Sequence, residues 1–220
     1  MIPLYDTLHS RRFPLVNWLL IGVNALVFLY ELTLSPAGLE RLTFTWGLIP
    51  AVLMAHPATA WITILTSMFL HGGWFHILSN MWVLFIFGDN VEDRLGGARY
   101  LIFYLLSGVA AALMETFILP GSGVPMIGAS GAIAGVLGAY LILYPRARVA
   151  SLVPILFIFT IIEIPASIFL LFWFVSQLFS GWLALGGAAG SGIAWWAHVG
   201  GFVFGMATVG LFAQRRAYYP

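Results

Sequence analysis

The sequence predicts an all-α, polytopic membrane protein, a bundle of six helices that cross the bilayer. Of its 220 residues, 61% are apolar and only 8% are charged, whereas soluble domains average about 45–50% and about 25%. A soluble chain of this length could not hide so much apolar surface from water. The apolar residues also gather into runs close to the ~20 residues that a helix needs to span the hydrocarbon core. We therefore expect the surrounding solvent to be largely lipid.

The predicted spans are separated by charged residues or by clusters of glycine and proline. Arg11 and Arg12 precede the first apolar run, and no small-residue cleavage site follows it, so we expect a retained helix rather than a signal peptide. The spans cover residues 13–34, 75–95, 98–119, 128–144, 165–181 and 193–213. They make one predicted domain, 13–213, between a short cytoplasmic N-terminus (1–12) and a cytoplasmic tail (214–220).

Two further segments connect these spans. Residues 35–74 carry little charge but include Trp46 and Trp61, which suits a first external loop lying on or in the membrane interface. Residues 149–164 are apolar but are interrupted by Pro154 and Glu163. Their content of isoleucine, phenylalanine and threonine favours an extended or interfacial segment over a seventh span.

Arginine placement predicts the orientation. With six spans, both termini lie on one side of the membrane, and eight of the nine arginines share that side; only Arg41 falls opposite. Positive residues collect in cytoplasmic loops, so both termini are expected in the cytoplasm. The second, fourth and sixth spans then run from outside inward. The short chain favours a bacterial inner membrane.

Composition excludes several kinds of chemistry. There is no cysteine and no lysine, which removes disulfides, thiol nucleophiles, Ser–Lys pairs and Schiff-base chemistry. The net charge is +1 and no basic tract occurs, so no nucleic-acid partner is expected. His71 and His76 have no third ligand at usable spacing, so neither a metal nor another cofactor is expected.

Four polar residues within spans are candidates for function, because such groups are costly in lipid. His76 and Asn80 lie four residues apart near the start of the second span, and Ser130 and His198 lie near the starts of the fourth and sixth. All three spans run inward, so at about 1.5 Å per residue the four side chains lie roughly 5–10 Å below the outer surface. Three helices can therefore bring them to one level.

This set of groups suits acyl transfer. A serine becomes a strong nucleophile when a base takes its proton, and imidazole is the usual base, which assigns these roles to Ser130 and His198. His76, Asn80 and the backbone N–H of Ser130 could donate to the oxyanion of the tetrahedral intermediate. No acidic residue falls near His198 in sequence or expected depth, so we expect a dyad rather than a triad.

Glycines predict close packing of the helices that carry the serine and the histidine. Gly131 and Gly135 follow Gly128 in the fourth span, and Gly201 and Gly205 are spaced in the same way in the sixth. Small residues four apart let two backbones approach closely. Packing these faces together would bring Ser130 and His198 within hydrogen-bond reach.

Simpler interpretations remain open for each residue alone. Serine in a glycine-rich span is usually a packing residue, and a buried histidine or asparagine often bonds two helices together. A transporter or channel is a second class, but it predicts polar groups near the midplane and internal repeats. A third class is a pseudoenzyme that binds transmembrane helices without cutting them. The common depth of the four residues favours the protease.

The motifs that carry these residues resemble the rhomboid intramembrane serine proteases. The matching stretches span nearly the whole chain and read HGGWFHILSN at 71–80, GDNVEDRLG at 88–96, GASG at 128–131 and AHVGGFVFG at 197–205. The resemblance implies a six-helix core. It also implies Ser130 as nucleophile, His198 as base, and an oxyanion hole of His76, Asn80 and the Ser130 backbone.

Two positions depart from the family's pattern. Many members carry a Trp-Arg pair in the first external loop, where this chain reads Trp61-Ile62-Thr63-Ile64. Some members place an aromatic residue four positions after the nucleophile, stacked on the catalytic histidine, but here that residue is Ala134. His198 must therefore be oriented by other groups.

The expected partners are membrane lipids and single-pass transmembrane substrates cut near their outer ends. Water must reach the serine through a polar cavity, roofed by the first external loop or by residues 183–192. Substrates must unwind locally, so we expect weak helix formers near the cleaved bond. Trp173 and Phe174 in the fifth span are candidates for a bulky gate. The oligomeric state, natural substrate and pathway are left open by the sequence.

Overall fold

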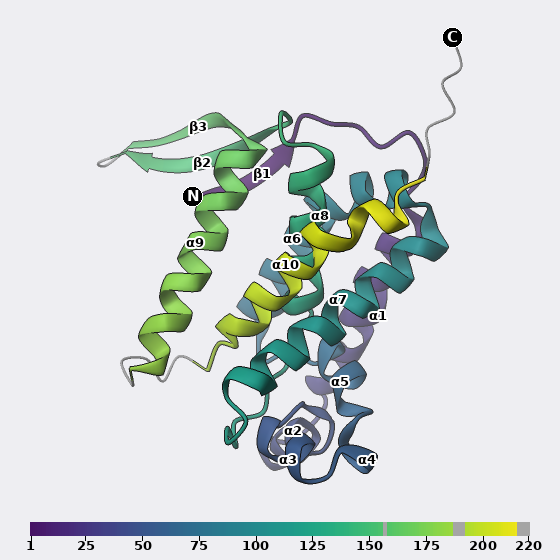
Figure 1. Ribbon diagram of the computed structural model, residues 1–220, viewed down its shortest axis with the longest axis vertical. Coiled ribbons are helices and arrows are strands. Elements are labelled where there is room, and N and C mark those ends of the chain that lie inside the picture. Colours follow the sequence, from purple (N-terminus) through teal and green to yellow (C-terminus); the bar gives the residue numbers. More distant parts are fainter. Residues whose placement is uncertain (156–157, 187–191, 215–220) are drawn as a thin grey trace.

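The computed structural model describes residues 1–155, 158–186 and 192–214. Helices dominate, with a small sheet at one end of the molecule (Figure 1). The elements in chain order are β1 (Ile2–Asp6), α1 (Leu15–Glu31), α2 (Pro36–Trp46), α3 (Pro50–Ala55), α4 (Pro57–Ala60), α5 (Thr63–Thr66), a 3-10 turn (Ser67–Phe69), α6 (Trp74–Leu95), α7 (Gly97–Ile118), α8 (Ser130–Leu143), β2 (Arg148–Ile155), β3 (Ile158–Pro165), α9 (Ala166–Leu185) and α10 (Trp195–Phe212).

The six apolar runs of the sequence coincide with α1, α6, α7, α8, α9 and α10. Among the described helices, α7, α9 and α10 are long and apolar enough to cross a membrane by themselves. A fourth candidate joins Thr63–Phe69 to α6 across a 94° bend, while α1 and α8 are shorter apolar helices. The chain is therefore an integral membrane protein built mainly of apolar helices.

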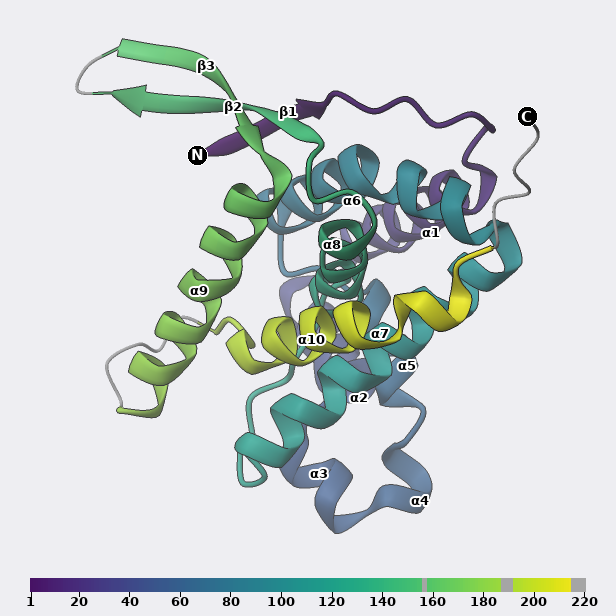
Figure 2. The ribbon, with the colours of Figure 1, turned by 45° about the horizontal axis from the view of Figure 1, so that its top comes forward.

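Helix α8 is the centre of the bundle. Figure 2 shows it between α6 and α10, and it packs against α6, α7 and α10. Every residue from Gly131 to Leu141 is buried. Glycine and alanine make up much of this helix, so the neighbouring backbones can approach it from several sides.

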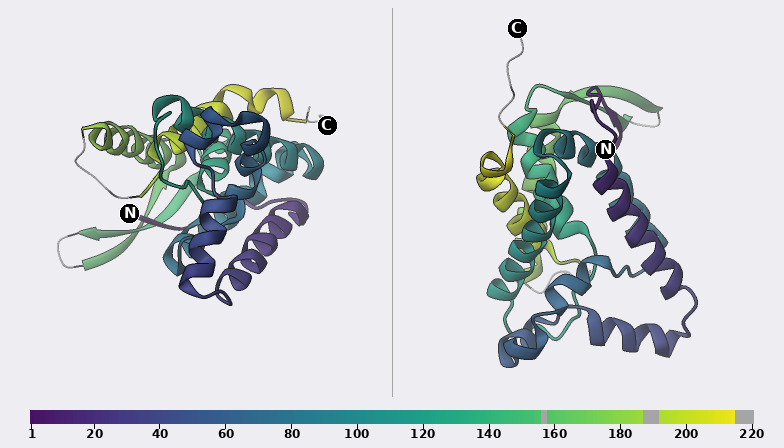
Figure 3. Two further views of the ribbon diagram at one scale, coloured as in Figure 1. Left: turned by 90° about the horizontal axis from the view of Figure 1, so that it is seen from below. Right: turned by 90° about the vertical axis from the view of Figure 1, so that its right-hand side faces the viewer.

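The segment between α1 and α6 folds into short helices that lie at the opposite end from the sheet (Figures 1 and 3). Its aromatic side chains remain exposed, at 53% for Phe44, 43% for Trp46 and 55% for Trp61. The segment is tied to the bundle by a backbone bridge between Leu48 and Met126. Exposed aromatic rings on a tethered segment are consistent with a position in the membrane interface.

The sheet has the antiparallel order β1-β2-β3 and contains the segment expected to be extended. Residues 149–164 form most of β2 and β3, with Leu152 opposite Ile161. The strand β1 was not predicted. It pairs Ile2 with Leu152 and Asp6 with Val149. These partners are far away in the sequence, so no local pattern predicts the strand.

Buried carboxylates join the helices in the part of the chain that the structure describes. Glu92 accepts from the backbone N–H groups of Val16 and Asn17 at the start of α1, at 3.1 and 2.7 Å. Glu31 accepts from the backbone N–H of His71 just before α6, at 3.1 Å. The first N–H groups of a helix have no carbonyl partner within their own helix, so Glu92 supplies the acceptors missing at the start of α1. Glu31 ties the end of α1 to the segment that leads into α6.

Candidate active site

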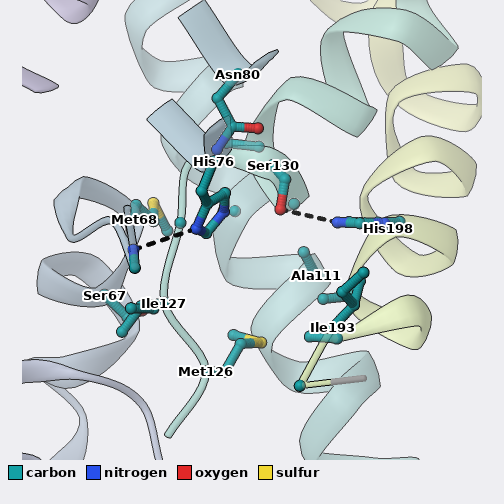
Figure 4. Close-up of a pocket in the computed structure, with 18 of the residues that line it drawn as sticks. Ser67, Met68, His76, Asn80, Ala111, Met126, Ile127, Ser130, Ile193 and His198 are labelled. Atoms are coloured by element: carbon teal, nitrogen blue, oxygen red, sulfur yellow. Dashed lines mark hydrogen bonds between the residues drawn. The ribbon is translucent and has the colours of Figure 1, made fainter. Parts of the chain in front are cut away.

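Ser130 is the first residue of α8, and its hydroxyl meets the imidazole of His198. The distance from Ser130 Oγ to His198 Nε2 is 2.8 Å (Figure 4). His198 lies in the first turn of α10 and is 9% exposed. Because α8 begins at Ser130, the Ser130 N–H has no carbonyl acceptor within its own helix and can bond to a ligand.

The close approach of α8 and α10 depends on their glycines. A Cβ added at Gly201 would lie 2.0 Å from the carbonyl oxygen of Gly131, and one added at Gly205 would lie 2.0 Å from that of Gly135. Neither distance leaves room for a methyl group against backbone. These contacts set the spacing of the two helices, and they begin at Gly131, next to Ser130, and at Gly201, three residues after His198.

His76 projects from α6 toward the loop that enters α8. Its Nδ1 accepts a hydrogen bond from the backbone N–H of Gly72 at 3.3 Å. The ring proton of the neutral imidazole then belongs on Nε2. A Cβ added at Gly128 would lie 2.5 Å from this Nε2, and Gly128 has a φ of +121°. Gly128 therefore lies against His76, beside Ser130, instead of in the α8–α10 contact.

Asn80 lies one turn further along α6 and is held by His71. The amide Nδ2 of Asn80 donates to His71 Nε2 at 3.1 Å, while His71 Nδ1 donates to the carbonyl of Phe69 at 3.3 Å. His71 is almost fully buried. The sequence suggested for this histidine only a role as a metal ligand; in the structure it lies behind Asn80, where it fixes the orientation of the amide.

A cavity of 410 Å³ joins the four predicted residues. Figure 4 shows Ser130 and His198 on one side of it, with His76 and Asn80 opposite. The remaining lining comes from the segment between α1 and α6, from the loops before α8 and α10, and from helix residues such as Gly108 and Ala111 of α7; Met68, Met126 and Ile193 are among its apolar members. Residues 187–191 of the expected roof lie outside the described part of the chain, but Gly192 and Ile193 line the cavity.

Gln177 is a polar contact of His198 that was not predicted from the sequence. His198 Nδ1 lies 2.8 Å from Gln177 Oε1, and Gln177 is 7% exposed. The rings of Trp173 and Trp195 flank the same imidazole at centroid distances of 6.0 and 6.1 Å. Gln177 stands four residues after Trp173 in a predicted span, where a polar side chain is itself a signal of function.

The position that some relatives fill with an aromatic residue is occupied by Ala134, which is fully buried. A Cβ added at Gly201 would already lie 3.4 Å from the Ala134 side chain. A ring at this position would therefore meet α10. The two tryptophans and Gln177 surround His198 instead.

The candidate gate residues lie where α9 packs on α10. The ring of Phe174 stacks on Phe202 at 4.6 Å, and Trp173 lies 5.8 Å from the same ring. Trp173 thus contacts both Phe202 and His198, whereas the contact of Phe174 is with Phe202.

The expectation that no acidic residue shares the depth of His198 was wrong. Glu115 Oε2 accepts from the backbone N–H of Ala197 at 2.8 Å. Glu115 belongs to the end of α7, which packs antiparallel to α10, so the end of α7 lies beside the start of α10. Its carboxylate serves the start of α10, and the imidazole bonds to Ser130 and Gln177.

Within the described residues, no group of three histidine, cysteine, aspartate or glutamate side chains is arranged to hold a metal ion. The groups that converge on the cavity are a hydroxyl, two imidazoles, an amide and the start of a helix. Chemically, this set can move a proton and stabilise a negative oxygen.

The sequence also matches a family model and several known proteins. The family model described as "Rhomboid domain" matches residues 58–215. Rhomboid protein 1, mitochondrial, of Saccharomyces cerevisiae is 28% identical over 198 residues, which are 85% of this chain and 50% of that protein. Rhomboid-like protein 11, chloroplastic, of Arabidopsis thaliana is 38% identical over 87 residues, 40% of this chain and 31% of that protein.

A bacterial relative carries the word protease in its name. Rhomboid protease GluP of Bacillus subtilis is 33% identical over 129 residues, which are 58% of this chain and 24% of that protein. The chain thus spans about half or less of the length of these three curated relatives.

Proposed function

The chain belongs to the rhomboid family, and from that premise we propose that it is an intramembrane serine endopeptidase with Ser130 as nucleophile and His198 as base. The observation that carries the proposal is the 2.8 Å contact between Ser130 Oγ and His198 Nε2 on the wall of a cavity. Isolated polar packing does not require a cavity beside the hydrogen bond, but a reaction with a peptide and water does.

The first half of the reaction makes an acyl-enzyme. Ser130 Oγ attacks the scissile carbonyl carbon while its proton passes to His198 Nε2. The carbonyl oxygen becomes an oxyanion. The C–N bond then breaks, and the leaving amine takes the proton from His198. Water completes the cycle by attacking the ester, with His198 again taking and returning a proton.

We expect three donors to stabilise the oxyanion. The Nε2–H of His76 faces the Gly128 loop, and one amide hydrogen of Asn80 remains after the bond to His71. The backbone N–H of Ser130 comes from the positive end of the α8 dipole. Each such donor contributes about 2.7–4 kcal/mol of transition-state stabilisation in well-studied hydrolases.

The same proposal includes a topology. One domain, residues 13–213, would cross the membrane six times, with residues 1–12 and 214–220 in the cytoplasm. Eight of nine arginines then lie on the cytoplasmic side. The cavity opens on the half of the bundle that holds α5 and the 3-10 turn, which would be the external half. The membrane would be a bacterial inner membrane, and labelling of engineered single cysteines in spheroplasts tests both assignments.

We propose single-pass transmembrane proteins as substrates. A helix hides its scissile carbonyl in backbone hydrogen bonds, so the cleaved segment should contain glycine or other weak helix formers. The glycine-rich surroundings of Ser130 favour a small side chain next to the cut bond. No cofactor is required by this mechanism.

The decisive experiment uses the purified chain reconstituted with a single-span substrate. Cleavage by the wild type should be lost in both Ser130→Ala and His198→Ala, and a serine-directed phosphonate should label the wild type at Ser130. Equal residual cleavage in the variants would contradict the dyad. Binding of the substrate without cleavage or labelling would instead indicate a pseudoenzyme.

A further inference from the structure

Each ring nitrogen of His198 makes one hydrogen bond, and the two partners come from different helices. Nε2 faces Ser130 Oγ from α8, and Nδ1 faces Gln177 Oε1 from α9, both at 2.8 Å. A neutral imidazole carries one proton, so one nitrogen donates and the other accepts. The identity of the atom facing Nδ1 decides which is which.

The amide of Gln177 can face His198 only with its oxygen. Its nitrogen donates to Ser176 Oγ at 3.0 Å and to the carbonyl oxygen of Trp173 at 3.3 Å. Turning the amide around would place oxygen against that carbonyl and an NH₂ group against Nδ1. Ser176 Oγ and the Trp173 carbonyl therefore both receive a hydrogen bond from the Gln177 amide only when Oε1 points at the imidazole.

We propose that Gln177 is the positioning residue of the base, holding His198 in the Nδ1–H tautomer that leaves Nε2 free to take the serine proton; the inference rests on the proposed function. The amide oxygen can only accept, so the Nδ1 proton belongs to the ring. Ser130 can then donate to Nε2. The other tautomer would present N–H to the serine and could not act as base.

Gln177 also acts during the reaction, without touching substrate. When His198 takes the proton from Ser130, the ring becomes a cation with N–H groups at both nitrogens. The amide oxygen stays hydrogen-bonded to Nδ1–H and stabilises this cation with the negative end of its dipole. Unlike an aspartate, it adds no second charge that must be desolvated in the bundle.

The aromatic neighbours of His198 do not accept a hydrogen bond from its Nδ1–H. Trp173 and Trp195 flank the imidazole and restrict the tilt of its plane. They contribute no acceptor to Nδ1, and Ala134 contributes none either. Rotation of the ring within its plane is held by the bonds to Ser130 and Gln177. The bond to Gln177 remains while Ser130 is acylated and cannot donate.

The test compares three changes at one position. Gln177→Leu removes the acceptor and should lower kcat about ten- to a hundredfold with little change in KM, the size of loss typical of a group that orients a reacting side chain. Gln177→Glu keeps an acceptor and should retain most of kcat. Its carboxylate favours the imidazolium, so the acid limb of the kcat/KM profile should move to higher pH. Gln177→Asn, one methylene shorter, should fall between them.

A purely structural role predicts the reverse order, because a buried carboxylate costs more than a leucine at a packing position. Leucine activity at wild-type level, or a glutamate variant that is less active than leucine, would overturn the inference. Thr208→Val is the matched control, since Thr208 bonds to its own helix at Phe204 O (2.7 Å) and should leave kcat unchanged.

Cleavage and phosphonate labelling of the wild type test the proposed function separately. Failure of the wild type to cleave and to react with the phosphonate would reject the protease itself. A wild type that does both, with Gln177→Leu equally active, would reject only the role of Gln177.

A measurement on the unmodified protein covers the case in which a variant does not fold. Nitrogen-15 NMR of labelled histidine, assigned with His198→Ala, should show Nδ1 protonated and Nε2 unprotonated when the ring is neutral. A predominant Nε2–H tautomer would overturn the inference.

Discussion

Glu115 accepts a hydrogen bond from the backbone N–H of Ala197, the residue immediately before His198. The carboxylate comes from the end of α7 and the N–H from the first turn of α10. The carboxylate therefore holds the start of the helix that carries the base, although it does not bond to the imidazole itself.

The contact predicts that Glu115→Leu lowers both stability and activity. An N–H group left unsatisfied in a buried site costs about 1–3 kcal/mol of unfolding free energy. The start of α10 would also shift, which should reduce kcat more than KM. Glu115→Gln keeps an acceptor oxygen and should lose much less of either. Thermal unfolding in detergent and cleavage rates check this, and equal effects of the two substitutions would count against a capping role.

The glycines between α8 and α10 give a second prediction. In Gly201→Ala the new methyl would lie 2.0 Å from Gly131 O, so the helices must separate. We expect a loss of about 1–3 kcal/mol of unfolding free energy and a large loss of cleavage, because Ser130 and His198 move apart together with their helices.

Gly210 is the matched control on the same helix. Nothing lies within 4 Å of a Cβ built there. Gly210→Ala should leave stability unchanged or raise it by up to about 1 kcal/mol, because alanine is the better helix former. Unfolding midpoints of the two variants test this, and similar losses in both would show that the loss at Gly201 does not come from its contact with Gly131.

The residues of the candidate site could be predicted because each one gives a signal in the local sequence. His76, Asn80, Ser130 and His198 are polar residues at matching positions in apolar runs, and the lengths of those runs predict the long helices. Glycine spacing in two runs adds which helices should touch. These signals do not depend on knowing the packing of distant side chains.

The missed features depend on that packing. Gln177 is a long side chain whose direction is set by Trp173 and Ser176, and Glu115 reaches His198's helix only because α7 and α10 lie side by side. Likewise, β1 forms because β2 offers it an edge nearly 150 residues later. Hydrophobic periodicity contains no information about any of these pairings.

Gly128 gives a prediction about the oxyanion hole. Its φ of +121° suits glycine, and an added Cβ would lie 2.5 Å from His76 Nε2. Gly128→Ala should therefore displace the donor and lower kcat about a hundredfold or more, the size expected for one oxyanion donor. Gly73→Ala controls for backbone strain alone, since Gly73 has a φ of +153°, no atom within 4 Å of its Cβ position and no part in the cavity lining. Similar kcat values in the two variants would contradict the assigned role of His76.

Asp6 predicts a pH-dependent contribution of the N-terminal strand to stability. Burial raises the pKa of its carboxyl from 3.8 to about 6, and nearby Asp89 adds to the rise. Hydrogen bonds from Tyr140 and Leu8 and the charge of His9 act in the opposite direction. The carboxyl also accepts from Asn90 Nδ2 at 3.0 Å.

The raised pKa of Asp6 determines whether stability rises or falls with pH. A carboxyl that is harder to ionise in the folded chain favours folding when protonated, in full below pH 3.8, and this contribution disappears as the pH rises through about 6. Asp6→Asn should therefore be more stable than the wild type near pH 7.5, by on the order of 1 kcal/mol because the group is partly exposed. The two unfolding midpoints should converge toward pH 5, and a constant difference across this range would contradict the assignment.

The gate is best tested at Phe174. Trp173 contacts the base as well as Phe202, so its removal would alter chemistry and access together. Phe174 stacks on Phe202 and should, when changed to alanine, loosen α9 against α10. If access limits the rate, Phe174→Ala should speed cleavage of a transmembrane substrate several-fold and leave cleavage of a short, unstructured peptide unchanged.

Phe172 supplies the control, since it lies on the same helix but is 61% exposed. Phe172→Ala should change neither rate, because its ring faces away from the α9–α10 contact. A Phe174→Ala variant that loses activity on both substrates in parallel would show that the ring stabilises the site and does not guard it. Because a peptide needs no lateral passage between helices, only the difference between the two substrates measures gating.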